Sequence, residues 1–136
     1  MKNTKAILIG LLVSFFIMTF FEFVNSLFFP FPPGMNTMSL EEVRAFTNTL
    51  PPVAFVMVLL GWATGSFAAG YMTTKRAIKN NLNVIKVVSI LGVILTGFAA
   101  LNNFVFLPGV QPMWFNVVGL PLFVIFTYIG YRVAKK

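Results

Sequence analysis

Polar side chains able to bind a proton or a cation gather at one predicted membrane depth. Glu22 interrupts the apolar run FFIMTFFEFVNSLFFP, residues 15–30. Asn25 and Ser26 follow it at i+3 and i+4, so a helix places them on the same face. The later apolar blocks add amides near the same depth. The sequence therefore predicts a polar cluster in the outer third of the bilayer: Glu22, Asn25, Asn102, Asn103 and Asn116.

The chemistry of this cluster depends on the charge of Glu22. A charged carboxylate inside a span costs roughly 3 kcal/mol on insertion scales, and no Lys, Arg or His lies within the predicted spans to neutralise it. Three interpretations stay open. Glu22 is neutral and donates a hydrogen bond to Asn103 or Asn116, which joins helices; it faces a water-filled pocket that binds a proton or a cation; or it contacts lipid or a partner chain.

Four apolar blocks must position these residues. The chain has 136 residues, of which 58% are hydrophobic and 10% charged. A helix needs about 20 apolar residues to cross a bilayer, and four blocks meet this, at about 6–29, 52–72, 87–107 and 113–131. They lack the alternation of a β-barrel, and the first is longer than a cleaved signal peptide requires. We expect one all-α membrane domain over 1–136, a four-helix bundle.

Charge predicts the orientation of this bundle. Nine of the ten Lys and Arg residues precede the first span, follow the fourth or lie between the second and third; the exception is Arg44. The positive-inside rule makes that side cytoplasmic. We therefore expect a bacterial inner-membrane protein with both termini cytoplasmic. We also expect contact with anionic lipid at the cytoplasmic face and no nucleic-acid partner, since the cations lie at span ends.

The outer loop between the first two spans has its own helical signal. Ser39 and Glu42 form an S-x-x-E capping box, apolar residues recur at helical spacing from Leu40 to Leu50, and two prolines end the run. This predicts an amphipathic helix at about 40–49 on the outer membrane surface. It serves either as a connector or as a lid over what lies beneath.

Small residues predict where the spans touch. Gly61, Gly65 and Ala69 recur every four residues in the second span, and Gly92 belongs to a similar stripe in the third. Such faces let helix backbones approach closely. A weak internal repeat pairs GYMTTKR at 70–76 with GYRVAKK at 130–136, which suggests a parallel duplication of two hairpins.

The composition argues against catalysis. The chain has no Cys and no His, which removes the usual nucleophile, general base and metal ligands. We predict no catalytic residue, metal or cofactor. A non-catalytic structural or accessory membrane component is the first hypothesis. The alternative is a small oligomeric transporter or channel, coupled to protons or cations through Glu22; a homo-oligomer or a larger membrane complex is compatible with either.

Two resemblances bear on these hypotheses. The segments SLEEVRAFT, GWATGSFAAG and PMWFNVVGLP resemble those of small four-span proteins of bacterial inner membranes, which implies the architecture but no activity. The first span, with EFV at 22–24, also resembles that of small multidrug transporters, which place a glutamate in the first of four spans. That resemblance implies ion-coupled transport, although the outer loop here is longer and the other spans depart from that pattern.

Overall fold

The computed structural model describes residues 2–78, 82–101, 105 and 109–136, and these form five α-helices. Four are long and apolar enough to cross a membrane: α1 (Lys2–Phe28), α3 (Pro52–Arg76), α4 (Leu82–Leu101) and α5 (Met113–Lys135). The fifth, α2 (Leu40–Thr49), is short and polar on one side. The all-α class with four long apolar helices is thus confirmed.

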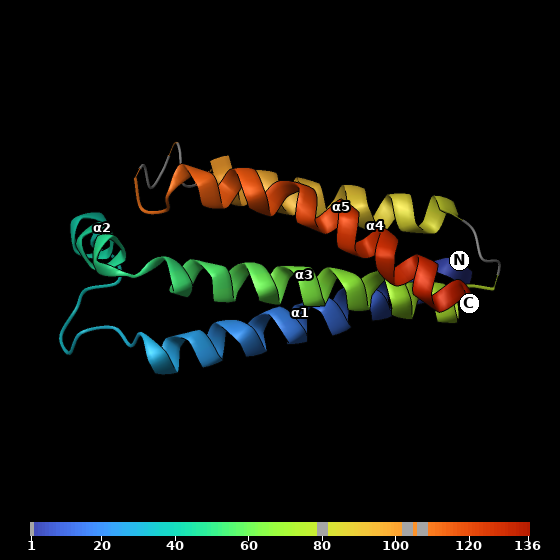
Figure 1. Cartoon of the computed structure of the whole chain (residues 1–136), viewed down its shortest axis with the longest axis horizontal. Coiled ribbons are helices and arrows are strands. Elements are labelled where there is room, and N and C mark those ends of the chain that lie inside the picture. Colours follow the sequence, from blue (N-terminus) through green and yellow to red (C-terminus); the bar gives the residue numbers. More distant parts are fainter. Residues whose placement is uncertain (1, 79–81, 102–104, 106–108) are drawn as a thin grey trace.

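The helices are arranged around α3, which lies between α1 and α5 (Figure 1). Both α1 and α5 pack closely along α3, whereas α4 packs mainly against α5 and touches α1 and α3 over short stretches. The two termini lie together at one end of the long helices, and α2 lies across the opposite end (Figure 1). We call these the basic end and the α2 end.

The helices at the basic end run past the apolar blocks. α3 continues to Arg76 and α5 to Lys135, while α4 starts at Leu82, before Lys86. Basic residues in the last turn of a helix are stabilised by the negative end of the helix dipole. Lys and Arg also have high helix propensity, so the helices extend beyond the apolar blocks. At the other end, the predicted limit of the third span at 107 lies outside the described residues.

Small residues on α3 and α4 meet large side chains of their neighbours. A Cβ on Gly61 would lie 2.6 Å from the Cβ of Phe21, and one on Gly65 would lie 2.9 Å from the Cγ of Met18, both on α1. Ala69 on the same stripe is buried. Gly92 on α4 faces Phe123 of α5, with 2.8 Å to a ring carbon. The four predicted packing residues therefore lie at helix–helix contacts.

One close helix crossing, between α3 and α5, involves two glycines that the internal repeat pairs. Gly70 of α3 lies against the carbonyl oxygen of Thr127, and Gly130 of α5 lies against the carbonyl oxygen of Phe67. Neither position has room for a Cβ, because the neighbour in each case is backbone. The two helices thus touch backbone to backbone near the basic end, a contact that the repeat did not by itself predict.

The short helix α2 occupies the predicted residues. The Ser39 hydroxyl accepts a hydrogen bond from the Glu42 backbone N–H at 3.4 Å, which is the N-cap half of the predicted box. The Glu42 carboxylate instead accepts from the backbone N–H of Asn36 at 2.7 Å. In a full capping box the Glu42 carboxylate would accept from the backbone N–H of Ser39. Here it accepts from Asn36 instead, and this bond connects the preceding loop to the helix.

Candidate functional site

A cavity of about 450 Å³ lies at the α2 end, between the long helices and α2. Helix α1 contributes Glu22, Asn25 and Ser26 to its wall. The apolar side of α2 covers it with Val43, Phe46 and Thr47. α3 and α5 add aromatic rings: Phe55, Trp62 and Phe115. We call this the α2-end cavity; its volume falls within the range of small-molecule sites.

The local sequence explains why α2 covers the cavity. Val43 and Phe46 are three residues apart, so they share the face that α2 turns toward the long helices. Phe46 also packs on Phe31 of the preceding loop, with ring centroids 5.0 Å apart. Because no described residue of α2 is buried, this helix rests on the cavity rather than within the core. Such placement fits the predicted lid better than a plain connector.

An aromatic cluster forms the floor of the cavity. The ring of Trp62 packs on Phe115 at 5.0 Å and on Phe123 at 5.6 Å, and Phe115 meets Phe55 at 5.7 Å. A Cβ on Gly119 would lie 2.6 Å from a ring carbon of Trp62, so the missing side chain makes room for the indole. The sequence alone did not single out Trp62, Phe55 or Phe115 as residues that line a cavity.

Glu22 is the acidic residue among the described residues that line the cavity. Its side chain is exposed rather than enclosed in the helix interface, and it lines the cavity. Among the described residues, no Lys or Arg side chain lines the cavity with it. Arg44 of α2 lies at the same end but is directed to Gly109, with its Nε 3.6 Å from where a Cβ would stand. The carboxylate therefore faces a ring-lined space in which no lining residue carries a positive charge.

Asn25 brings an unsatisfied polar atom to the same wall. Its side-chain oxygen is buried and has no hydrogen-bond partner among the described residues. By contrast, the hydroxyl of Ser26 donates to the backbone oxygen of Phe23 at 2.7 Å. Buried polar atoms are normally paired, so the Asn25 oxygen and the Glu22 carboxylate mark the part of the cavity where a ligand that donates hydrogen bonds or carries positive charge fits.

The predicted polar cluster is assembled only in part. Glu22 and Asn25 line one cavity. Asn116 is buried on α5, one residue beyond the cavity-lining Phe115, and does not itself line the cavity. No described hydrogen bond joins Glu22 to Asn116. Asn102 and Asn103 lie outside the described residues.

A metal ion is a poor candidate for this cavity. Among the described residues, no group of three His, Cys, Asp or Glu side chains is placed to hold one. Ca²⁺ takes six to eight oxygen ligands, whereas the α2-end cavity offers one carboxylate. Aromatic faces instead attract organic cations.

No protein-family model, curated protein or solved structure gives a significant match.

Proposed function

We propose that this chain is a non-catalytic multi-pass component of the bacterial inner membrane that binds an organic cation in the α2-end cavity. The observation that carries the proposal is the position of Glu22 in a ring-lined cavity of about 450 Å³. A carboxylate neutralises a cation directly, and aromatic faces add about 0.5–2 kcal/mol through cation–π attraction. In this proposal the basic end lies in the cytoplasm, so the cavity opens on the outer side.

The limits of the cavity favour binding over passage through the chain. Glu22 and Trp62 are its deepest residues on α1 and α3, and none of its lining residues comes from the basic half of either helix. Below them, Trp62 packs on Phe123 and against Gly119. A cation that enters from the α2 end therefore meets a floor of rings, which suits an accessory component that holds a ligand at the outer face.

One observation favours the alternative, a small oligomeric transporter. A second cavity of about 360 Å³ lies nearer the basic end, and Ser14 and Ser66 are among its otherwise apolar lining. The Ser66 hydroxyl is buried without a partner among the described residues. If rearrangement joined the two cavities, these hydroxyls would extend a polar path from Glu22. Cation flux into liposomes that Glu22→Gln abolishes would establish this alternative.

The binding proposal is tested by the fluorescence of Trp62. Replacing Trp114 by Phe leaves Trp62 as the single indole, since the chain has two Trp. Titration with tetraethylammonium is expected to change its emission with saturation. Glu22→Gln should weaken binding roughly 30-fold, because the Coulomb attraction between a carboxylate and a nearby cation in a partly hydrated cavity contributes about 2 kcal/mol.

The matched control is Glu41→Gln, which removes the same charge from α2 at a position that does not line the cavity. It should bind within twofold of the parent. Equal affinity of the parent and Glu22→Gln would show that Glu22 binds no cation. Suppose that Glu22→Gln also leaves the melting temperature unchanged, whereas Glu22→Leu lowers it. These results together would support a structural role, in which Glu22 donates a hydrogen bond between helices.

A further inference from the structure

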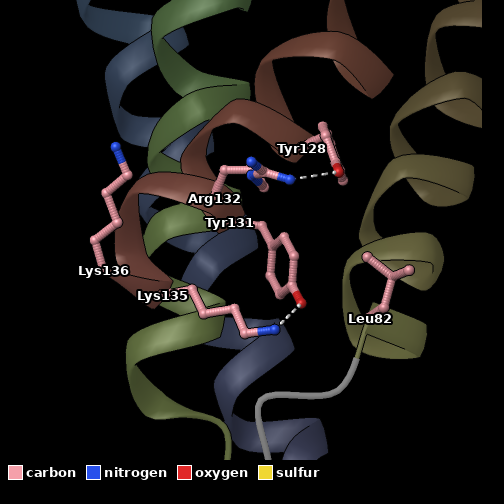
Figure 2. A pocket seen from close by; sticks show the side chains of 6 residues that line it. All are labelled: Leu82, Tyr128, Tyr131, Arg132, Lys135 and Lys136. Carbon is pink, nitrogen blue, oxygen red and sulfur yellow. Dashed lines mark hydrogen bonds between the residues drawn. The ribbon is translucent and has the colours of Figure 1, made fainter.

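A second charged cavity lies at the basic end, between the start of α4 and the last turns of α5. Its volume is about 430 Å³, and it is lined by Leu82, Tyr128, Tyr131, Arg132, Lys135 and Lys136 (Figure 2). We call it the head-group cavity. Of the six described residues that line it, three have positively charged side chains and none has an acidic side chain. The three Glu residues of the chain lie in α1 and α2, away from it.

Two tyrosines hold the cations at the wall of this cavity. Arg132 donates a hydrogen bond to the hydroxyl oxygen of Tyr128 at 3.5 Å, and Lys135 donates to that of Tyr131 at 3.4 Å (Figure 2). Lys135 also lies 5.7 Å from the centroid of the Tyr131 ring. Because each hydroxyl accepts from a cation, its own proton is left to donate to another acceptor. The two hydrogen bonds are long and engage one nitrogen each of Arg132 and Lys135. The other N–H groups of these two side chains can therefore donate to a ligand.

An apolar groove continues from the head-group cavity along α4 and α5. It has a volume of about 480 Å³ and shares Leu82 and Tyr128 with the cavity. Its other walls are mainly aliphatic, from Ile85 through Ile90 to Ile94 on α4, with Val124 on α5. From Leu82 to Ile94 the helix rises about 18 Å. We call this the α4–α5 groove; it runs from the charged end toward the middle of the apolar helices.

The basic residues at the end of α3 have the same charge but border neither the head-group cavity nor the α4–α5 groove. Lys75 and Arg76 close α3 at the same end of the molecule, and Lys75 lies over the ring of Tyr71 at 5.8 Å. Both are exposed, and neither lines the head-group cavity or the groove. They are the expected basic residues at a helix C-terminus. Arg132 and Lys135 differ because they border a cavity that opens into an apolar groove.

We propose that the head-group cavity and the α4–α5 groove together bind one anionic phospholipid. Its phosphate oxygens accept from Arg132, Lys135 and the tyrosine hydroxyls, which are charge-assisted bonds where the donor is a cation. One acyl chain lies in the groove. A lipid with a net negative head group fits, whereas the ammonium of a zwitterionic head group would meet three cations. This inference is independent of the cation site, which involves different residues at the opposite end.

Native mass spectrometry of the detergent-purified protein tests the inference. The probe is phosphatidylglycerol, with phosphatidylcholine for comparison. The wild type should retain one phosphatidylglycerol at least tenfold more strongly than phosphatidylcholine. The double variant Arg132→Ala/Lys135→Ala should lose at least tenfold in retention. The double variant Lys75→Ala/Arg76→Ala, which removes the same charge from the same end, should stay within twofold of the wild type.

A second pair of variants tests the groove without changing charge. Ile90→Trp fills the groove and should lower phosphatidylglycerol retention at least fivefold. Leu91→Trp, one residue along α4 and outside the groove lining, should not. The inference is overturned if the two charge-removal variants behave alike, if Ile90→Trp retains lipid like the wild type, or if millimolar inorganic phosphate displaces the lipid. The last two results would reduce the site to a general anion surface.

Discussion

The α2-end cavity and the head-group cavity have nearly equal volumes, about 450 and 430 Å³, but opposite charge. The first holds one carboxylate above aromatic rings and is covered by α2. The second holds three cations beside two tyrosines and opens into an aliphatic groove. Volume therefore does not distinguish the ligands that the two cavities favour. The charge on the wall and the surface that continues from it do.

The packing of α3 against α5 accounts for part of this difference. Near the basic end, Gly70 and Gly130 bring the two backbones into contact. Toward the α2 end, the rings of Trp62 and Phe115 lie between the same helices. Small residues let α3 and α5 approach each other at the basic end, and large side chains keep the two helices farther apart at the α2 end. The ring-lined floor of the α2-end cavity is a consequence of this divergence, which Figure 1 also shows.

The largest expected effect comes from breaking the close end of that pair. Gly70→Leu places a side chain against the carbonyl of Thr127, and backbone cannot rotate away as a side chain can. We expect a loss of about 3 kcal/mol in the free energy of unfolding, at the upper end for overpacking. Thermal unfolding in detergent measures it. Gly97→Leu is the control, because a Cβ on Gly97 meets no atom within 4 Å. Similar melting temperatures for both variants would contradict the backbone contact.

A smaller effect is expected at the open end. Trp62→Phe replaces the best cation–π ring by a weaker one and should lower tetraethylammonium affinity about fivefold, which corresponds to about 1 kcal/mol. Titration calorimetry measures this without relying on the indole. Trp114→Phe serves as control because Trp114 does not line the α2-end cavity. Neither variant should alter phosphatidylglycerol retention, and a parallel loss at both cavities would show that they are not independent.

The smallest effect is expected from the cover of the α2-end cavity. Ser39→Ala removes the hydroxyl that accepts from Glu42, and loss of such an N-cap costs about 1 kcal/mol. Amide hydrogen exchange within α2 should rise about fivefold, and cation affinity should fall by less. Thr37→Ala, two residues earlier and exposed, should leave exchange unchanged. Unchanged exchange in Ser39→Ala would mean that contact with the long helices alone holds α2.

Local signals predicted the elements better than the contacts between them. The cap at Ser39 and the prolines after Leu50 located α2 at Leu40–Thr49, because both signals act within a few residues. Apolar length predicted the four long helices. Depth along a helix also follows from counting residues, and Glu22 and Asn25, which the sequence places one turn apart, line one cavity.

The rotation of one helix against another is not a local property. It is decided by which side chains meet, and this is why Asn116 was expected beside Glu22 although it does not line the cavity. For the same reason the sequence did not predict that Phe55 and Phe115 line the cavity, or that Gly70 and Gly130 each lie against the backbone of the other helix. The sequence shows that the dipeptide Gly-Tyr occurs at 70–71 and again at 130–131. That the two dipeptides lie at one helix crossing is evident only from the fold.

The most direct test of the account follows the carboxyl carbon of Glu22 by NMR. The chain has three acidic residues, Glu22, Glu41 and Glu42, so protein labelled with ¹³C at the glutamate carboxyl gives three resonances, and Glu22→Gln assigns the first. Addition of tetraethylammonium is predicted to shift the Glu22 resonance with saturation and to leave those of Glu41 and Glu42 in place. A Glu22 resonance that does not move, or moves no more than the two on α2, would contradict a cation site in the α2-end cavity.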